Sequence, residues 1–295
     1  MLLGSLPGRS CINEYKALLN GDVIFTDAYN ASLHARLNLD DKALFRRRLH
    51  KADSTYRATG RLEDYSDYAV MLVYTGNYQQ AKKTLREIEQ TLPGLYNTAA
   101  NLGTVYELLG QNDSAFYWIK KAIEIDSASH HGSEWIHLKI LEAKLKAKGD
   151  ERYYSNHNIL SLDFGLDEIP ENKNNLDLKK LQDDLYYQLS ERMSFIKPKD
   201  AIVAQLLFDL GTVTAMVRDV KSAIQIYESA KEYGYSSELF DRRLSYFKIL
   251  QQEADQKNDP ENIFGEQSLL IVFISGIGFI VLILIRRKKR KQKKT

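Results

Sequence analysis

Residues 62–95 read LEDYSDYAVMLVYTGNYQQAKKTLREIEQTLPGL, and residues 96–129 read YNTAANLGTVYELLGQNDSAFYWIKKAIEIDSAS. A common pattern of small and large residues recurs in the two stretches at a spacing of 34 positions. In the first stretch the pattern consists of Tyr68, Ala69, Leu72, Gly76, Tyr78, Ala81, Leu85, Ile88 and Pro93. The positions 34 residues later are Leu102, Gly103, Tyr106, Gly110, Asn112, Ala115, Ile119, Ala122 and Ser127. Self-similarity at a fixed period predicts that one unit of structure is built twice.

This pattern resembles the tetratricopeptide repeat (TPR), whose unit is a pair of antiparallel helices spanning 34 residues. The resemblance implies an all-α solenoid of helical hairpins that binds other polypeptides. Small residues such as Ala81 and Gly103 fall where the helices of a pair must approach closely. Large residues such as Leu85 and Ile119 are expected to fill the spaces between helices.

Further helical units follow along the chain. Residues 204–237 return to the pattern, with the Leu210-Gly211 pair and the small residues Ala223 and Ala230. Trp135–Ala147 predicts another first helix, because its apolar residues fall at helical spacing. Between these units, residues 149–175 form a polar insertion, which we expect to be irregular. An amphipathic helix is predicted from Leu178 to Ile196, ending before Pro198.

The two ends of the solenoid match the repeat less well. Residues 12–60 are predicted to be mostly helical and to form a divergent N-terminal helix pair, since end repeats of solenoids are often atypical. A helix starting near Glu238 is expected to cover the last open face. The solenoid therefore spans residues 11–250 and is followed by a polar linker at 251–267.

Composition narrows the class of protein. The chain has 295 residues, 44% of them hydrophobic and 27% charged, as in ordinary folded proteins. Its net charge of +2 is misleading, because eight of its 41 basic residues lie in the last ten positions. The remainder has 33 basic and 39 acidic residues, a net charge of about −6. A nucleic-acid partner is therefore not expected, and no cofactor is expected either.

Residues 268–285 predict a transmembrane helix. Leu269–Ile285 holds seventeen residues without a charge, which is about 26 Å of helix against a hydrocarbon core of about 30 Å. A basic tail follows at once and is expected to stop transfer through the membrane; its first six residues are Arg286, Arg287, Lys288, Lys289, Arg290 and Lys291. A buried core helix is the alternative, but such a helix would scarcely end in a run of cations.

The charge distribution also predicts an orientation. The basic flank of a membrane helix normally stays cytoplasmic, so residues 1–267 are expected to be extracytoplasmic, as in a bacterial envelope protein. This orientation requires an N-terminal export signal. Residues 1–10 resemble the last part of one, and Gly8-Arg9-Ser10 has the form of a cleavage site. The true start of the protein would then lie upstream of Met1. The alternative is a frayed N-terminus. Cys11 fits a lipid-modification site poorly.

A second reading of the same tail keeps the repeats in the cytosol. In a tail-anchored adaptor on an organelle membrane, the C-terminal segment alone inserts. That reading requires the eight basic residues of the tail to cross the bilayer, so the exported orientation is favoured.

The sequence shows no set of residues that predicts catalysis. Asp163-Phe164-Gly165 spells a kinase magnesium motif, but the other kinase motifs are absent. His130, His131 and His137 lack the carboxylate or cysteine set of a zinc site. Cys11, the single cysteine, has no histidine partner at a recognisable spacing. No enzyme activity and no metal site are therefore expected, although a polar cluster in the 149–175 insertion is where an enzyme reading would begin.

In the TPR family the first helices of the units line a concave groove that binds a protein or peptide. The resemblance implies that the groove of this chain is lined by Val70, Val73, Tyr74, Asn97, Thr104, Glu107, Gln205, Phe208, Thr212 and Met216. One subclass grips the C-terminal carboxylate of chaperones, but here Ser66 and Val70 stand where lysine and asparagine are expected. The sequence therefore predicts a membrane-anchored scaffold, similar to envelope TPR proteins that pass signals across the inner membrane. The identity of its ligand and its oligomeric state stay open.

Overall fold

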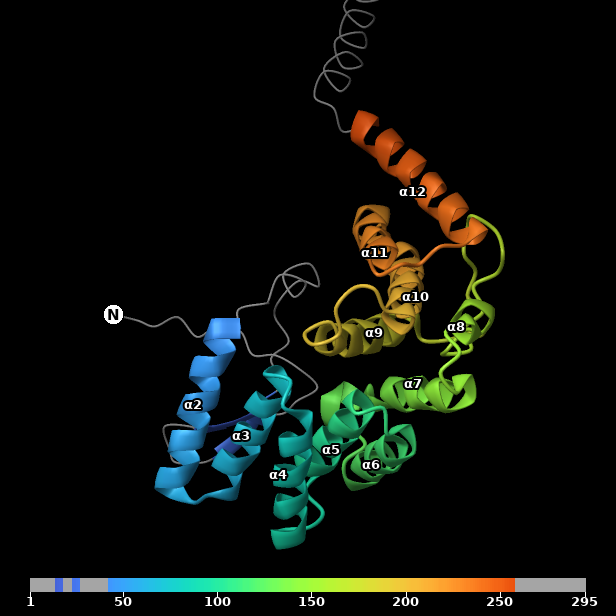
Figure 1. Ribbon diagram of the computed structural model, residues 1–295. Coiled ribbons are helices and arrows are strands. Elements are labelled where there is room, and N and C mark those ends of the chain that lie inside the picture. The colour runs from blue at the N-terminus through green and yellow to red at the C-terminus, as the bar shows by residue number, and fades with distance from the viewer. Residues whose placement is uncertain (1–13, 18–22, 27–41, 258–295) are drawn as a thin grey trace, which may run out of the picture. The chain divides into compact units, whose positions relative to one another are not determined.

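The computed structural model describes residues 14–17, 23–26 and 42–257, and the regular secondary structure of these residues is helical apart from one β-hairpin (Figure 1). The hairpin consists of β1 (Glu14–Ala17) and β2 (Val23–Thr26). The helices are α2 (Lys42–Thr59), α3 (Leu62–Tyr74), α4 (Tyr78–Thr91), α5 (Tyr96–Leu108), α6 (Asn112–Ile125), the short 3-10 helix η1 (Ser129–Gly132), α7 (Glu134–Ala147), α8 (Arg152–Asn156), α9 (Leu178–Arg192), α10 (Ala201–Val217), α11 (Val220–Glu232) and α12 (Glu238–Lys257). The contacts divide into two units, one ending at Leu244 and the other beginning at Ser245 inside α12. The helical pairs belong to the first unit.

Helical hairpins occupy the three stretches in which the 34-residue pattern is clear. The pairs are α3 with α4, α5 with α6, and α10 with α11, and the two helices of each pair are in contact. The structure therefore has the helical repeat architecture that the pattern predicts.

The turn inside each of the first two hairpins depends on a glycine in the left-handed region. Gly76 has φ +79° and Gly110 has φ +70°. In each case the residue after the glycine donates its N–H to a carbonyl five residues back, from Asn77 to Leu72 and from Gln111 to Tyr106, at 2.8 and 2.9 Å. This is the hydrogen-bond pattern of a Schellman cap, which an L side chain at the glycine position would strain. The two glycines lie 34 positions apart in the sequence, so the turn repeats with the unit.

Small residues allow close approach within the hairpins, as the sequence predicts. Ala81 and Ala115 are fully buried. A Cβ added to Gly103 would lie 2.4 Å from Cδ1 of Ile119, and one added to Gly211 would lie 2.3 Å from Cδ1 of Tyr227. Each glycine therefore leaves room for a large side chain of the second helix to pack against the backbone of the first.

The later helices start at aspartates. The side chains of Asp177, Asp200 and Asp219 accept hydrogen bonds from the backbone N–H three residues on, at the N-termini of α9, α10 and α11. An N-cap carboxylate satisfies one of the backbone donors that the first helical turn leaves without an intrahelical partner.

The 149–175 insertion is fixed to the helices by side chains that bind its backbone. Gln205 of α10 donates to the carbonyls of Tyr154 and His157 at 2.7 and 2.9 Å, and its Oε1 accepts from the N–H of Ile159 at 2.6 Å. Within Asp163-Phe164-Gly165 the aspartate accepts from the N–H of Gly165 at 2.9 Å, so this triplet is a turn. The insertion contains the short helix α8, and its backbone is held in place by these contacts.

Three boundaries differ from those that the sequence predicts. Part of residues 12–60 forms the β-hairpin, with Tyr15 opposite Phe25, instead of a helix that would pair with α2. The helix α9 ends at Arg192, short of Ile196. The helix α12 continues to Lys257, into the stretch predicted to be a linker, because that polar stretch contains helix-forming Gln, Glu, Ala and Lys residues.

Candidate functional site

The residues predicted to line a ligand groove are mostly interior. The buried ones are Val70, Val73, Asn97, Thr104, Glu107, Gln205, Phe208 and Thr212, and each is at most 7% exposed. Tyr74 and Met216 are half-buried. The expectation that all ten positions face an open groove is therefore corrected at eight of them. Binding of a ligand on this side of the helices stays a prediction.

Several of these side chains are engaged inside the protein. Gln205 holds the insertion, and the hydroxyls of Thr212 and Tyr227 form a hydrogen bond of 2.7 Å. The ring of Phe208 stacks on that of Tyr235, with centroids 4.6 Å apart. These contacts stabilise the fold and leave those side chains unavailable to a ligand.

Glu107 of α5 is the centre of a buried ionic cluster that joins three helices. Its carboxylate accepts two hydrogen bonds from Arg192 of α9, at 2.7 and 3.0 Å. Nε2 of His137 lies 2.7 Å from one carboxylate oxygen, and Nζ of Lys144 lies 2.6 Å from the other, both on α7. Burial favours the neutral acid, but the three cationic groups outweigh it and hold the pKa of Glu107 well below its usual range.

Two of the three histidines that the sequence singles out, His130 and His137, belong to the same buried region, whereas His131 is exposed. Nδ1 of His130 lies 2.5 Å from a carboxylate oxygen of Glu134, and the hydroxyl of Tyr96 donates to that same oxygen at 3.1 Å. Burial lowers the pKa of His137, but the hydrogen bond to Glu107 and the carboxylate of Glu134, 3.6 Å away, raise it by more, so the net shift is upward. Within the part of the chain that the structure describes, no group of three or more His, Cys, Asp or Glu residues could hold a metal ion.

The helix α9 is bound along its length to η1 and α7. Nε1 of Trp135 donates to Asp184 at 3.0 Å, and Nε2 of Gln188 donates to Oγ of Ser133 at 3.0 Å. Thus α9 packs against α7 and is joined to α5 by the ion pair of Arg192 with Glu107, two helices on which the sequence predicts a groove or its continuation. The chain therefore fills this part of the expected groove itself.

A hollow remains open beyond the C-terminal end of α9. We call it the aromatic hollow; it has a volume of about 290 Å³ and is lined by Phe45, Arg46, Val73, Tyr74, Thr75, Gly76, Tyr78, Ser194, Phe195 and Lys197. These residues come from α2, from α3 and the turn after it, from the start of α4, and from the segment after α9. Two of the predicted groove residues, Val73 and Tyr74, line it.

Aromatic rings and positive charge dominate the aromatic hollow. The rings of Phe45 and Tyr74 stack with centroids 4.8 Å apart and planes 7° apart. Arg46 is exposed, and Lys197 is half-buried with its Nζ 3.4 Å from the carbonyl oxygen of Met193. Among the described residues that line the hollow none is acidic. The site can therefore offer apolar contact to one part of a ligand and attract negative charge on another.

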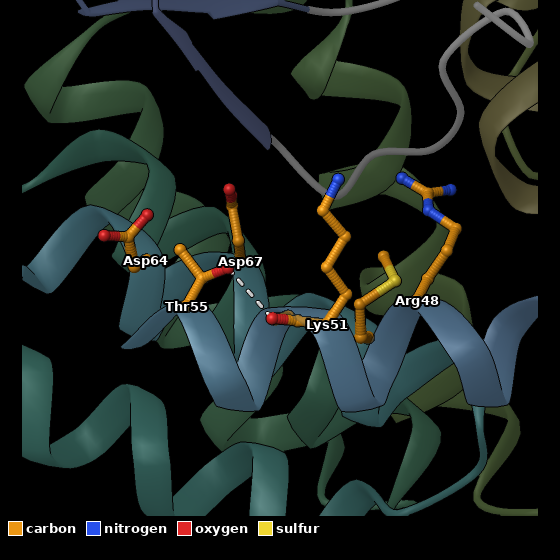
Figure 2. A pocket seen from close by; sticks show the side chains of 7 residues that line it. Arg48, Lys51, Thr55, Asp64 and Asp67 are labelled. Carbon is orange, nitrogen blue, oxygen red and sulfur yellow. Dashed lines mark hydrogen bonds between the residues drawn. The ribbon is translucent and has the colours of Figure 1, made fainter. Parts of the chain in front are cut away.

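A second hollow, between α2 and α3, has balanced charge. Figure 2 shows Arg48 and Lys51 of α2 beside Asp64 and Asp67 of α3. Burial raises the pKa of Asp64, but hydrogen bonds from Arg61 and Thr59 lower it by more, so the net shift is downward. The carboxylate of Asp64 is therefore already engaged within the protein. This hollow has no excess of either charge, so it is a weaker candidate than the aromatic hollow.

Arg46, Phe195 and Lys197 were not recognised from the sequence. Arg46 lies within Arg46-Arg47-Arg48, where it has no distinguishing neighbour, and the other two lie in the segment that links α9 and α10. The fold brings these segments together across about 150 positions of sequence, and no local pattern marks such a contact.

The predicted membrane segment lies outside the described residues. Residues 268–285 are not among the described residues, and neither are the basic residues Arg286, Arg287, Lys288, Lys289, Arg290 and Lys291. Residues 1–11, with the predicted cleavage site, also lie outside the described residues. No helix that the structure describes is both long enough and apolar enough to span a bilayer.

Comparisons with known proteins give limited guidance. No protein-family model matches the chain, and no curated protein matches it in sequence. Among solved structures, it is similar to a tetratricopeptide repeat protein from Parabacteroides merdae ATCC 43184, whose crystal structure has a resolution of 2.39 Å. That match covers 73% of this chain and 97% of the other, at 11% identity and a TM-score of 0.30. A score this low carries no argument. The TPR family is therefore suggested by the repeat pattern and the helical hairpins.

Proposed function

We propose that this chain is a non-enzymatic scaffold of the TPR type that docks a segment of a protein partner in the aromatic hollow. The observation that carries the proposal is the hollow itself, in which the stacked rings of Phe45 and Tyr74 lie beside the cations Arg46 and Lys197. Aromatic side chains supply large contact areas, and arginine and aromatic residues are enriched in the centres of protein interfaces. The buried histidines and carboxylates are paired with one another, so they support a structural role more than a catalytic one.

We also propose that the scaffold is anchored by residues 268–285 with its helical hairpins outside the cytoplasm. The uncharged run of Leu269–Ile285 and the basic tail after it support this arrangement. The second candidate is a tail-anchored adaptor whose hairpins face the cytosol. A reporter enzyme fused after Thr295 and active only in the cytosol separates the two, since activity is expected for the exported orientation and loss of activity for the other.

The binding proposal is tested by photo-crosslinking of the full chain in the membranes of cells that produce it. Tyr74 is replaced by p-benzoylphenylalanine, which keeps an aromatic ring in the hollow. Tyr117 on α6 is the matched control, because it is also a tyrosine and is 60% exposed outside the hollow. Irradiation is expected to give a discrete protein adduct at position 74 and none of that mass at position 117.

Mass spectrometry then identifies the adduct and the crosslinked peptide. A partner peptide attached at position 74 supports docking in the hollow. An absence of adducts at position 74, or the same set of adducts at both positions, contradicts it.

A further inference from the structure

The insertion contains an exposed turn, Leu166–Ile169, that we call the insertion tip. Its two aliphatic side chains are largely in solvent, since Leu166 is 76% exposed and Ile169 is 61% exposed. Between them lie two acidic residues, Asp167 and Glu168. The insertion tip thus presents apolar surface and negative charge together.

The backbone of the insertion tip is held by two arginines of α12. The guanidinium of Arg243 is buried and donates to the carbonyls of residues 164, 165 and 167, at 2.8, 2.9 and 3.0 Å. Arg242 donates to the carbonyl of Leu166 at 2.7 Å. Next to the tip, the ring of Phe164 is buried. Two of these four hydrogen bonds go to the insertion tip itself and two to the residues just before it, so the turn is already organised for binding, and preorganisation lowers the entropy that a contact must overcome.

The insertion tip and the aromatic hollow are complementary. The hollow offers aromatic rings with Arg46 and Lys197, and the tip offers two aliphatic side chains with two carboxylates. Glu168 lies 3.9 Å from Arg242, a loose pair at the surface, so Asp167 is the carboxylate better placed for the cations of a hollow. At about 30 Å³ for each water in the liquid, a hollow of about 290 Å³ holds the volume of roughly ten waters, which is room for one or two aliphatic side chains.

The tip is not seated in the hollow of its own chain. The exposure of Leu166 and Ile169 shows this directly, and the arginines that hold the tip belong to α12, which contributes no residue to the lining of the hollow. The complementary surface is therefore available to another molecule.

We propose that the insertion tip of one copy of this chain occupies the aromatic hollow of a second copy. This inference rests on the proposed function, because it names the partner of the same hollow. The contact joins two different surfaces, so it is head-to-tail and extends to rings or chains of molecules instead of closing as a two-fold dimer. Side by side in a membrane, anchored copies would form such a row.

The test uses charge reversal of the full chain in a mild detergent, with assembly followed by sedimentation velocity over a range of concentrations. One variant reverses the hollow, Arg46→Glu with Lys197→Glu. Another reverses the tip, Asp167→Lys with Glu168→Lys. The matched control is Lys120→Glu with Lys221→Glu, two exposed lysines outside both surfaces. Far-UV circular dichroism checks that each variant is folded.

We expect the wild type and the control to assemble as concentration rises, and each reversed variant alone to have a dissociation constant at least about tenfold higher. An equimolar mixture of the two reversed variants should assemble again, because each reversed tip then meets a hollow of opposite charge. A variant with Leu166→Ser and Ile169→Ser changes exposed residues alone, so it should fold and stay monomeric.

Three results overturn the proposal: a wild type that stays monomeric at all concentrations, reversed variants that assemble like the control, or a mixture that fails to assemble. Failure of self-assembly can be distinguished from failure of the proposed function. If position 74 crosslinks to a different protein while the chain is monomeric, the scaffold function stands and self-assembly is wrong. If position 74 gives no adduct at all, both are wrong.

Discussion

The helices between residues 62 and 125 pack mainly through small and large apolar side chains, whereas those between residues 134 and 243 combine apolar packing with buried ionic and polar contacts. In the first region Ala81, Ala115 and Ile119 are fully buried at the contacts between helices. In the second, Arg192, Gln205 and Arg243 reach carboxylates or backbone groups of other elements. Apolar packing depends on volume and tolerates partial change, while a buried charge depends on its partner being present. The two regions should therefore respond differently to single substitutions.

The largest effect is expected for Arg192→Met. Loss of the guanidinium leaves the buried carboxylate of Glu107 with Lys144 and His137 alone, and removal of one partner of a buried ion pair costs about 3–5 kcal/mol. Urea unfolding of the full chain in detergent measures the loss. In the apolar region, Ile88→Val should cost about 0.5–1.5 kcal/mol.

A surface pair provides the control for this cluster. Lys139 and Glu142 lie 2.7 Å apart but are 43% and 32% exposed, so Lys139→Met should change the free energy of unfolding by less than about 1 kcal/mol. If Arg192→Met costs no more than this control, the cluster does not hold α7 and α9 to α5.

The next effect is local. Arg243→Gln removes a charged donor from three backbone carbonyls of the insertion. Each hydrogen bond to a charged group contributes about 1.5–3 kcal/mol, but water replaces part of what is lost, so local stability should fall by about 3 kcal/mol in total. Hydrogen exchange of residues 163–171 should accelerate, while that of α3–α6 should be unchanged. Arg242→Gln should have a smaller effect because its single hydrogen bond is exposed. Uniform acceleration over all helices would contradict the local role of Arg243.

Asp209 makes the second region sensitive to pH. Burial raises the pKa of this carboxyl to about 7, opposed by the hydrogen bond from Asn158 and the charge of Arg243. Since the folded pKa exceeds the unfolded one, this group stabilises the fold at low pH, and that stability is lost as pH rises from about 4 to about 7. Asp209→Asn removes the titration, so the variant does not lose this stability as pH rises. The free energy of unfolding of the variant minus that of the wild type should therefore be about 2 kcal/mol larger at pH 7 than at pH 5. Denaturant unfolding at both values measures the difference, and a constant difference would show that Asp209 does not titrate in this range.

The smallest change in stability is expected for alanine substitutions at the same repeat position in the two regions. An alanine Cβ at Gly211 would meet the rigid ring of Tyr227, whereas one at Gly103 would meet the flexible end of Ile119. Overpacking costs about 1–3 kcal/mol, and the better helix propensity of alanine offsets about 1 kcal/mol of this. The free energy of unfolding should therefore fall by about 1 kcal/mol in Gly211→Ala. Gly103→Ala should cost less, as measured by thermal unfolding. The reverse order would show that the ring of Tyr227 can move aside.

These differences also explain how far the sequence predicts the structure. The hairpins at 62–129 and 204–237 could be predicted because each unit buries the same small and large positions at the same spacing. The insertion could be located by its polarity, but not its attachment, because Gln205 and Arg243 bind backbone atoms and a backbone acceptor has no sequence signature. The β-hairpin was missed because Glu14–Ala17 and Val23–Thr26 are too short to show a clear period.

The candidate site was predicted in part for a similar reason. Helical position alone assigns Glu107 and Thr104 to a groove, and it cannot show that both are buried, Glu107 against Arg192 from a separate segment. Tyr74 was identified because it lies on a first helix at the open end. Arg46 and Lys197 were not identified, since they come from separate segments, one before and one after the first two repeats.

The most direct test concerns the claim that the expected groove is filled by the chain itself along α5 and stays open beside Tyr74. In the full chain with Cys11→Ser, a single cysteine is introduced as Tyr74→Cys or as Thr104→Cys, and the rate of maleimide labelling is measured in native conditions and in urea. Tyr74 is half-buried at the hollow and Thr104 is 2% exposed. We predict that the cysteine at position 74 reacts at nearly its unfolded rate and that the one at position 104 reacts at least about tenfold more slowly, because it must wait for local opening. Equal labelling at the two positions in the native chain would contradict the account.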